Sequence, residues 1–575
     1  MSTQLTEVNS VLGIEIGSVL TRAVLFDVVE ESYQFIAAGS AATTDGAPHF
    51  DVSTGVLEAL EQLQQITGKY LLDLNKKLII PSHGGIEGVD KLVVTLSCGA
   101  DLHAATFGLL SDLSLASADK LARCFPLNIA DGFGINDRRP LQKQIDALQI
   151  ARPDLLIFAG GADRGATKSI QRMAAMIASA LQLMPENNRP AILYCGNHAI
   201  KKKVKESLDK YTSVLITNNI LPEIDSEDLT QASFDLNQMI VTKKIKTLNG
   251  LEQLASVCNH QPLMTGLGFQ HVIKYLGRLY DPARGVLGID MGSSHTIAAY
   301  SNRQNSTLRT LPLGTGLGLE NLLSRTKVDE IQKWIGDEIS DEYIMEYLWQ
   351  KTLFPHSQPV TVIDHQIELA LIRQILSLTI HDLVSSAALP TVNFEPIIIS
   401  GSPLTQAAAP WQVLLALLDG IQPLGITPLV VDKHGIMSLL GAAARVNPLL
   451  PVQVLESTAF INLATVITLE SKARFGSLLL EGKLQSQTGG RQDFEVRQGH
   501  LLSLPLPFGE TGGLHLKAQK NLQISDVELN GEAIKVKGGV CGLVFDARGR
   551  PLRLPDNPAL RRELLKTWMD FPNTH

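Results

Sequence analysis

Short apolar runs that end in glycine turns recur along the chain and predict many of its β-strands. Two of these runs are closely similar, Val11-Leu-Gly-Ile-Glu-Ile-Gly17 and Val286-Leu-Gly-Ile-Asp-Met-Gly292. In each copy a small hydroxyl residue follows the last glycine, and a threonine, Thr21 or Thr296, opens a second apolar run. The pattern predicts two strand-turn-strand hairpins, one in each half of the chain.

The residues after the first hairpin predict a mixed region followed by a regular alternation of strands and helices. A third strand is expected at 33–40, a helix at 52–66 and a fourth strand at 91–96. From residue 151, strands at 154–159, 191–194 and 214–217 alternate with helices at 167–183 and 199–210. Such alternation favours parallel strands with crossover helices, so we expect a doubly wound α/β segment in the first half.

The second half repeats the opening pattern and ends in a β-rich tail. Strands are expected at 286–291, 295–301, 307–312, 396–400 and 428–432, with helices at 328–350, 365–388 and 436–445. Asn447-Pro-Leu-Leu-Pro451 interrupts the pattern, short alternating runs follow, and a helix at 557–569 closes the chain. We therefore expect four parts: 1–150, 151–284, 285–447 and 448–575.

The composition is that of a multidomain water-soluble protein. The chain has 575 residues, 45% hydrophobic and 19% charged, with a net charge of −8, so it lacks the basic excess that non-specific nucleic-acid binding requires. Residues 1–10 have no secretory-signal pattern, and no apolar run reaches the ~18 residues that cross a membrane. The five cysteines stand singly, without a Cys-x-x-Cys pair. We expect a cytoplasmic protein that binds neither nucleic acid nor membrane.

The two hairpins are candidate phosphate sites. A buried strand that ends in a glycine turn exposes backbone N–H groups, which together form an anion-binding concavity. The residues suited to phosphate are Gly17, Ser18, Thr21 and Arg22 in the first hairpin and Gly292, Ser293, Ser294 and Thr296 in the second. The alternatives are a tight turn between buried strands and, for Arg22, a solvated residue at a strand edge.

One carboxylate in each hairpin is a candidate Mg²⁺ ligand. Asp290 ends a buried strand, where a charge needs compensation that a metal on nucleotide phosphates would supply. Glu15 holds the matching position in the first hairpin, and its additional methylene displaces the carboxylate in a site that is sensitive to geometry. A turn or capping role is the alternative for Asp290.

Three further glycine-rich segments are candidate ligand loops. Gly401 and Ser402 follow an apolar strand in a turn that would allow close approach of a purine and ribose. Gly314 and Gly316 belong to a cluster that either lines a nucleotide cleft or forms a flexible turn. Residues 159–167 follow a strand and open a helix, so they form either an anion site or a helix start at Asp163.

These segments, in this order, resemble the phosphate and adenosine motifs of the actin-like ATPase and sugar-kinase superfamily. Within it, the closer resemblance is to the glutamate mutase L (MutL-type) family, on Ala159-Gly-Gly-Ala-Asp-Arg-Gly165, Thr217-Asn-Asn-Ile-Leu-Pro222 and both hairpins. The resemblance implies an α/β actin-like fold of two ribonuclease-H-like halves. It also implies an accessory protein that binds ATP and Mg²⁺ and assists or reactivates a coenzyme B12-dependent mutase, its protein partner.

Two departures from the family pattern bear on ATP hydrolysis. Glu15 replaces an aspartate, and Ile297 stands where the family often has an aspartate. Both changes favour slow ATP hydrolysis at most. Binding of ATP through backbone N–H donors does not depend on these side chains.

The residues leave two other functions open. A small-molecule kinase would need a carboxylate base in the cleft, and the candidate is Asp101, which follows the fourth expected strand and is otherwise an ordinary loop residue. A degenerate scaffold that binds little nucleotide and acts through its β-rich tail is the other alternative. Slow hydrolysis coupled to a partner, a phosphorylated product, or no nucleotide binding would distinguish the three functions.

Overall fold

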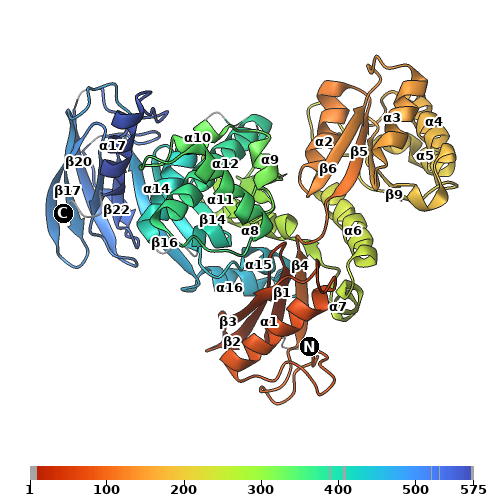
Figure 1. The fold of residues 1–575 in the computed structure, drawn as a ribbon, viewed down its shortest axis with the longest axis horizontal. Helices are drawn as coiled ribbons and strands as arrows, with labels where there is room; N and C mark the ends of the chain where they lie inside the picture. Colours follow the sequence, from red (N-terminus) through yellow and green to blue (C-terminus); the bar gives the residue numbers. More distant parts are fainter. Residues whose placement is uncertain are drawn as a thin grey trace, which may run out of the picture. The chain divides into compact units, whose positions relative to one another are not determined.

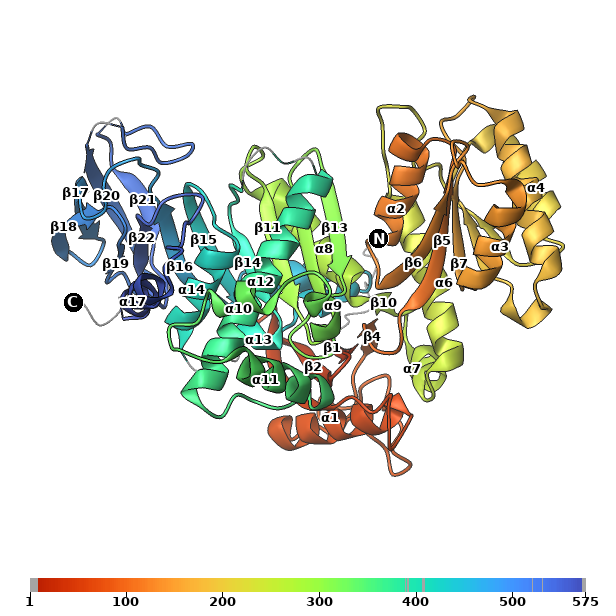
Figure 2. The same cartoon turned by 45° about the horizontal axis from the view of Figure 1, so that its top comes forward.

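The computed structural model describes residues 9–387, 389, 392–405, 409–519, 521–529 and 531–570. Contacts between residues divide the chain into two compact units. One unit contains Val11–Ala23 and Gly39–Gly268, and the other contains Val24–Ala38 and the chain from Phe269 onward. Figures 1 and 2 show the strands and helices of both units from two directions.

The first sheet has five strands in the order β10-β4-β1-β2-β3. Its strands are β1 (Ser10–Ile16), β2 (Leu20–Val29), β3 (Ser32–Ala42), β4 (Lys91–Leu96) and β10 (Leu263–Met264). β1 is buried along its whole length and pairs in parallel with β4, as its continuous apolar run predicts for a central strand. α1 (Val52–Thr67) packs so closely on β3 that a Cβ atom at Gly39 would lie 2.2 Å from Ala59 O. The expected strands and helix of this region are confirmed.

The second sheet starts with the same order of strands. Its order is β13-β12-β11-β14-β15-β16-β22-β19, and the first five strands are β11 (Val286–Met291), β12 (Thr296–Ser301), β13 (Ser306–Leu311), β14 (Ile397–Ser400) and β15 (Ile426–Asp432). β11 pairs antiparallel with β12 and in parallel with β14, which pairs in parallel with β15. Both halves therefore contain three meandering strands followed by two parallel ones. This duplicated arrangement is the actin-like ATPase fold, which confirms the expected fold class.

A third sheet, β6-β5-β7-β8-β9, is parallel throughout and lies in the chain between β4 and β10. Its strands are β5 (Leu102–Gly108), β6 (Leu127–Phe133), β7 (Leu155–Ala159), β8 (Ala191–Tyr194) and β9 (Val214–Ile216). In Figures 1 and 2, α3 (Leu141–Ala151) and α4 (Thr167–Leu183) cover one face, and α2 (Ala116–Ala122) lies on the other. In chain order the strands read 2-1-3-4-5, a doubly wound order.

The inserted sheet starts earlier in the chain than residue 151, the start expected for the doubly wound segment. β5 and β6 precede that residue, and β5 is hydrogen bonded to β7 with Ala104 opposite Leu155. β6 is an edge strand in which only Phe133 is buried, so it lacks the apolar run that marks the other strands. The strands and helices expected after residue 151 are confirmed at β7, α4, β8, α5 (Lys201–Leu208) and β9.

Helices connect and cover the sheets. After the inserted sheet come α6 (Thr230–Thr247), α7 (Leu251–Val257) and α8 (Thr265–Leu279). The second half contains α9 (Leu319–Leu323), α10 (Val328–Gln332), α11 (Asp341–Leu353), α12 (Val362–Ala387), α13 (Ser402–Thr405), α14 (Pro410–Gly420), α15 (Met437–Ala443) and α16 (Leu449–Leu455). The helix expected at 328–350 is divided, because Ser340 starts α11 by accepting a hydrogen bond from Tyr343 N. Among the described residues, no helix combines the length and apolar character needed to cross a membrane.

The C-terminal residues are rich in β-strands, as expected, but some of these strands join the second half. β16 (Phe460–Thr468) pairs antiparallel with β15, and β22 (Leu543–Asp546) and β19 (Leu501–Leu504) extend the same sheet. The sheet therefore continues past the expected boundary at 447. A separate antiparallel sheet has the order β18-β17-β20-β21, formed by β17 (Leu478–Ser486), β18 (Arg491–Arg497), β20 (Thr511–Ala518) and β21 (Ile534–Lys537). α17 (Pro558–Met569) confirms the expected terminal helix.

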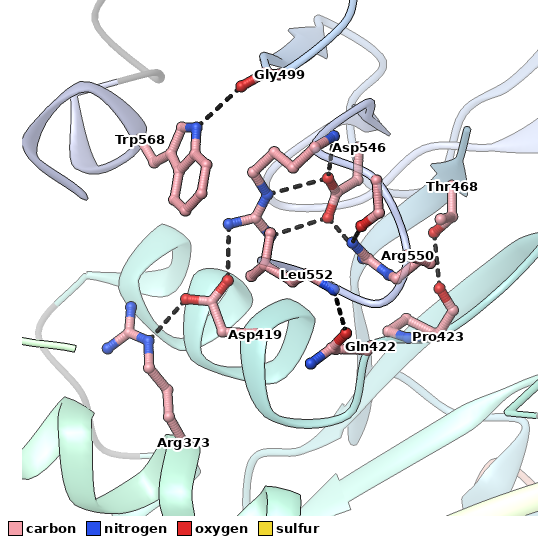
Figure 3. Close-up of polar contacts among 12 residues, drawn as sticks. Arg373, Asp419, Gln422, Pro423, Thr468, Gly499, Asp546, Arg550, Leu552 and Trp568 are labelled. Carbon is pink, nitrogen blue, oxygen red and sulfur yellow. Dashed lines mark hydrogen bonds and ion pairs between the residues drawn. The ribbon is translucent and has the colours of Figure 1, made fainter. Parts of the chain in front are cut away.

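A buried network of ion pairs joins the C-terminal strands to the helices of the second half (Figure 3). Arg548 Nη1 lies 2.7 Å from Asp419 Oδ1 on α14, and Arg548 Nη2 lies 2.9 Å from Asp546 Oδ2 on β22. Arg373 on α12 donates to the other oxygen of Asp419, and Arg550 donates to Asp546. All five side chains are at most 5% exposed. Charged contacts thus fix β22 against α12 and α14.

Candidate functional site

The turn of the first hairpin, between β1 and β2, requires glycine. Gly17 N donates a hydrogen bond to Leu20 O at 2.9 Å, which closes the turn. A Cβ atom at position 17 would lie 2.6 Å from Leu20 O. Ser18, the next residue, is half-buried in this turn. The geometry is that of a tight glycine turn, in which the candidate phosphate donors are backbone groups.

Two threonine side chains stabilise this turn through hydrogen bonds. Thr43 Oγ1 donates to Gly17 O at 2.8 Å, so its contact with Thr21 Oγ1 at 2.9 Å is one in which Thr21 donates. Thr43 N also donates to Val19 O at 2.9 Å. Thr21 is fully buried. Thr21 was a candidate ligand from the sequence, whereas Thr43 was missed because it lies beyond the third strand, far from the motif.

The acidic residue of the first hairpin is paired with the arginine of the same hairpin. Arg22 Nε donates to Glu15 Oε2 at 3.1 Å, and Arg22 Nη2 contacts the same oxygen. The Glu15 side chain is 6% exposed and that of Arg22 is 22% exposed. The sequence pattern assigns these residues separate roles, Glu15 as a metal ligand and Arg22 as a phosphate contact. The geometry shows a carboxylate whose charge is balanced by a guanidinium.

The second hairpin has the same kind of turn, between β11 and β12. Gly292 N donates to His295 O at 2.9 Å, and Thr296 Oγ1 donates to Leu313 O at 2.7 Å in a fully buried contact. His295 Nδ1 lies 2.9 Å from Ser294 Oγ, a local contact that fits a turn residue. Thr296, like Thr21, is therefore held inside the hairpin rather than exposed at its turn.

The glycine cluster around Gly314 packs directly on this turn. Gly316 N and Gly318 N donate to Ser293 O at 3.0 and 2.9 Å, and Leu317 N donates to Ser293 Oγ at 3.2 Å. A Cβ atom at Gly314 would lie 2.2 Å from Ser293 O, and one at Gly316 would lie 2.3 Å from Ser293 Oγ. The loop needs glycine because its backbone touches the hairpin. These contacts show a loop that packs on the second hairpin and argue against a flexible turn.

Asp290 and the adenosine-like turn lie at the same end of neighbouring strands. Asp290 on β11 is opposite Ser400 on β14. Gly401 has φ = +98°, and a Cβ atom there would lie 2.1 Å from Met291 O, so only glycine fits beside β11. Ser402, next in the chain, is half-buried at the start of α13. The structure thus brings the metal candidate and the adenosine candidates together within one unit.

A buried aspartate that sequence reasoning missed supports this strand end. Asp432 Oδ2 accepts a hydrogen bond from Ser400 Oγ at 3.0 Å, and its carboxylate also accepts from Ile436 N at 3.0 Å and Met437 N at 2.9 Å. The side chain is completely buried. Asp432 therefore fixes Ser400 and the start of α15. The available signal was an acidic residue that ends an apolar strand a few positions before a helix.

Asp101, the candidate kinase base, lies near a buried lysine. Lys244 on α6 donates to Cys98 O at 2.7 Å and to Ala100 O at 3.1 Å, in the loop after β4. Burial lowers the pKa of Lys244, and the negative charges of Asp101 and Asp45 oppose that shift. Asp101 is therefore placed beside an ammonium group that helps to fix the loop, a setting that suits a structural carboxylate.

Asp163 in the inserted sheet connects three loops. Its Oδ1 accepts from His198 N at 2.8 Å and from Asn219 Nδ2 at 3.1 Å, and Asp163 N donates to Pro222 O at 3.0 Å. The N-cap residue of α4 (Thr167–Leu183) is instead Ala166, which makes no side-chain capping hydrogen bond. The helix-start interpretation of Asp163 is therefore wrong, because the carboxylate binds neighbouring loops at the carboxyl ends of β7, β8 and β9.

The side chains and backbone groups of the candidate site are better suited to a nucleotide that carries its metal than to a metal ion bound by protein side chains alone. The described part of the chain contains no group of three or more His, Cys, Asp or Glu side chains that could hold a metal. Mg²⁺ commonly binds through one or two carboxylates, substrate phosphates and waters, so Asp290 alone is compatible with Mg²⁺ carried by ATP. The glycines at positions 17, 292 and 401 are required by the turns themselves, because protein backbone atoms lie where a Cβ atom would be.

Comparisons with known proteins give one family match. Residues 11–459 match the sequence model of the family described as MutL protein. No curated protein matches the chain. Among solved structures, a diol dehydratase-reactivating factor in nucleotide-free form is 9% identical over 78% of this chain and 100% of that chain, with a TM-score of 0.28. The xylulose kinase from Bifidobacterium adolescentis is 12% identical over 76% and 93%, with a TM-score of 0.28. The family match covers both hairpins and the inserted sheet.

Proposed function

Because this chain belongs to the MutL protein family, we propose that it is an ATP-binding accessory protein that assists or reactivates a coenzyme B12-dependent mutase. The observation that carries the proposal is the duplicated sheet order, with a glycine-turn hairpin in the same place in each half. Two such hairpins in one chain suit a ligand with several phosphates.

Each part of ATP·Mg²⁺ has candidate residues. The backbone N–H groups around Gly17 and Ser18, and those of Ser293 and Ser294, would receive the phosphates. Asp290 would hold Mg²⁺ through its waters, and Gly401 and Ser402 would face the adenosine. Bound Mg²⁺ would neutralise phosphate charge. Gly314 and Gly316 would keep the second hairpin rigid, because their loop donates to Ser293 O.

The ion pair of the first hairpin favours binding over hydrolysis. Glu15 is held by Arg22, so its carboxylate is less available to orient a metal-bound water than a shorter, unpaired aspartate would be. Ile297 lies opposite Asp290 on the neighbouring strand, where an aspartate would supply a second carboxylate. We propose slow ATP hydrolysis at most, which suits a protein whose bound state must last while it acts on a partner.

Nucleotide binding would act on the partner by closing the two halves. A ligand that contacts both hairpins binds the closed arrangement more tightly than the open one, and its differential affinity shifts the equilibrium toward closure. The kinase alternative is less well supported, since its only candidate base, Asp101, is a neighbour of buried Lys244.

The test is a reactivation assay with a purified coenzyme B12-dependent mutase inactivated by turnover. We expect wild-type protein with ATP, Mg²⁺ and fresh coenzyme to restore mutase activity. The variant Asp290→Ala should restore little, and Glu495→Gln, on the exposed face of β18, should match wild type. Equal recovery with and without ATP, or with Asp290→Ala, would contradict the proposal.

A further inference from the structure

Two segments connect the inserted sheet to the first sheet, and both meet at one buried side chain. Residues 97–101, which we call the base loop, lead from β4 into β5, and α6 leads back toward β10. Lys244, in the last turn of α6, is only 2% exposed. Its ammonium group donates to three consecutive carbonyls of the base loop, those of Cys98 at 2.7 Å, Gly99 at 3.4 Å and Ala100 at 3.1 Å. The base loop is therefore curled around a buried cation.

The curled form of the base loop depends on this cation. An ammonium group has three N–H donors, and each has a carbonyl of the base loop as its acceptor. Gly99 has φ = +76°, a left-handed conformation that lets the chain turn around the ammonium. Buried carbonyls that lose their donor pay the cost of desolvation without the hydrogen bond, so the loop would have to rearrange without Lys244.

The base loop also contacts the turn of the first hairpin, by two routes. Its first backbone N–H donates to Ile16 O at 2.9 Å, directly before Gly17 of the turn. In the second route, Gly99 N donates to Asp45 Oδ2 at 2.9 Å. Asp45 comes two residues after Thr43, whose hydroxyl donates to Gly17 O at 2.8 Å. The position of the base loop is thus transmitted to the backbone groups that are the candidate phosphate donors.

α6 itself is tied to both sheets. Glu227, just before the helix, accepts from Ser117 Oγ at 2.6 Å and pairs with Lys120 Nζ at 3.1 Å, both on α2 of the inserted sheet. Asn237, in the middle of α6, is 1% exposed and accepts from Met264 N of β10 at 2.7 Å. The helix therefore runs from the inserted sheet to the first sheet, and Lys244 lies at the end that holds the base loop.

We propose that Lys244 is a positioning residue of the nucleotide site, which holds the base loop against the turn of the first hairpin and makes ATP binding depend on the anchoring of α6. Displacement of α6 would withdraw the ammonium from its carbonyls, and the base loop would no longer support Gly17. Because coupling between two sites is reciprocal, bound ATP would in turn hold α6 and the base of the inserted sheet in place. The inference deepens the proposed function and rests on it for the identity of the ligand.

Titration calorimetry with ATP and Mg²⁺ on the full-length protein tests this role. Lys244→Met removes the ammonium and keeps an unbranched side chain, and Asp45→Ala removes the acceptor of Gly99 N at a half-buried position. We expect each variant to weaken ATP binding about fivefold or more, the low end of common coupling between sites. The control Thr106→Val removes a hydrogen bond to Asp119 inside the inserted sheet. It should lower the thermal midpoint and leave ATP affinity unchanged.

Hydrogen exchange without nucleotide distinguishes failure of this proposal from failure of the proposed function. In nucleotide-free protein, Lys244→Met and Asp45→Ala should speed amide exchange in peptides that cover residues 14–21, and Thr106→Val should not. No ATP binding by wild type would contradict the proposed function and leave the exchange result to judge Lys244.

Three results would overturn the role of Lys244. The first is wild-type exchange at residues 14–21 in both folded variants, and the second is equally fast exchange there in Thr106→Val. The third, where wild type binds ATP, is a smaller loss of affinity than expected in both variants. If Lys244→Met does not fold, Asp45→Ala decides each comparison alone.

Discussion

The pair formed by Glu15 and Arg22 shows how the first hairpin accommodates a buried glutamate. Glu15 Oε2 accepts from Arg22 Nε at 3.1 Å, and the carboxylate is almost fully buried. A buried carboxylate is costly unless it is paired, so the arginine makes the glutamate tolerable. The same contact ties the Glu15 carboxylate on β1 to the Arg22 side chain on β2.

This pairing predicts slow ATP hydrolysis that a shorter side chain would accelerate. Wild-type turnover should lie below ~1 s⁻¹, the low end of common enzymes, and Glu15→Asp should raise it while ATP affinity changes only a few-fold. The measurement is steady-state phosphate release at saturating ATP. Glu61→Asp, which shortens an exposed carboxylate paired with Lys76, is the matched control and should not alter turnover. Fast wild-type hydrolysis, or loss of activity in Glu15→Asp, would show that Glu15 is the proper ligand.

For single residues, the sequence predicted which positions matter more reliably than it predicted which residues contact each other. The glycines of both turns were identified because the absence of a side chain is visible in a sequence. The brace from Thr43, the support from Asp432 and the pairing of Glu15 with Arg22 were not identified. The first two depend on which distant segments become neighbours, and a local motif does not carry that information. The pairing of Glu15 with Arg22 lies within the predicted hairpin and depends on how its two strands align.

Among the strands and helices, β22 and the loop after it depend most strongly on buried ion pairs for their packing. Asp546 accepts from Arg548 and Arg550, and Arg548 also contacts Asp419 on α14. The guanidinium of Arg548 lies 4.7 Å from the ring centroid of Trp568 on α17. The network thus connects β22, α14 and α17, three elements far apart in the sequence.

Removing one carboxylate from this network should strongly destabilise the second half. Asp546→Asn leaves buried guanidinium groups without their full charge compensation, so we expect a loss of about 3–5 kcal/mol in the free energy of unfolding. Glu495→Gln breaks a pair in which both side chains are 53% exposed and should change the free energy by less than about 1 kcal/mol. Urea unfolding followed by tryptophan fluorescence measures both. Similar values for the two variants would show that the network contributes little.

The acid response provides a second readout of the same network. Arg548 and Arg550 hold the pKa of Asp546 well below its usual range, against the opposing effect of burial. A carboxyl whose pKa is lowered on folding stabilises the protein above its unfolded pKa of about 3.9 and loses that contribution as pH falls further. Wild type should therefore lose stability below about pH 4 more steeply than Asp546→Asn.

The individual strands and helices were largely predictable from the sequence. Which strands join into one sheet was less predictable. The helix at 167–183 was predicted with the bounds it has, because its apolar residues recur at helical spacing. β6 was missed, since an edge strand with polar positions has no clear apolar pattern. β16 was assigned to the tail, but pairing with β15 places it in the sheet of the second half. Hydrogen bonding between distant strands determines such groupings.

For the whole molecule, the repeated sheet order is the strongest link between sequence and function. Similar hairpin motifs in the two halves predicted a duplicated fold, and both sheets show the same arrangement of their first five strands. The inserted sheet and the C-terminal strands add surfaces that the duplication does not require. We therefore propose that nucleotide binding belongs to the duplicated hairpins.

The central claim is that the paired hairpins bind ATP with Mg²⁺, and titration calorimetry of wild type, Asp290→Ala and Asp163→Ala tests it most directly. We expect wild type to bind, and its thermal midpoint to rise with ATP, because a ligand that binds only the folded state stabilises it by about 2.7 kcal/mol at a hundred times its dissociation constant. Asp290→Ala should lose the Mg²⁺-dependent part of the affinity, while Asp163→Ala, in the inserted sheet, should retain it. No heat and no shift at millimolar ATP in wild type, or equal losses in the two variants, would contradict the account.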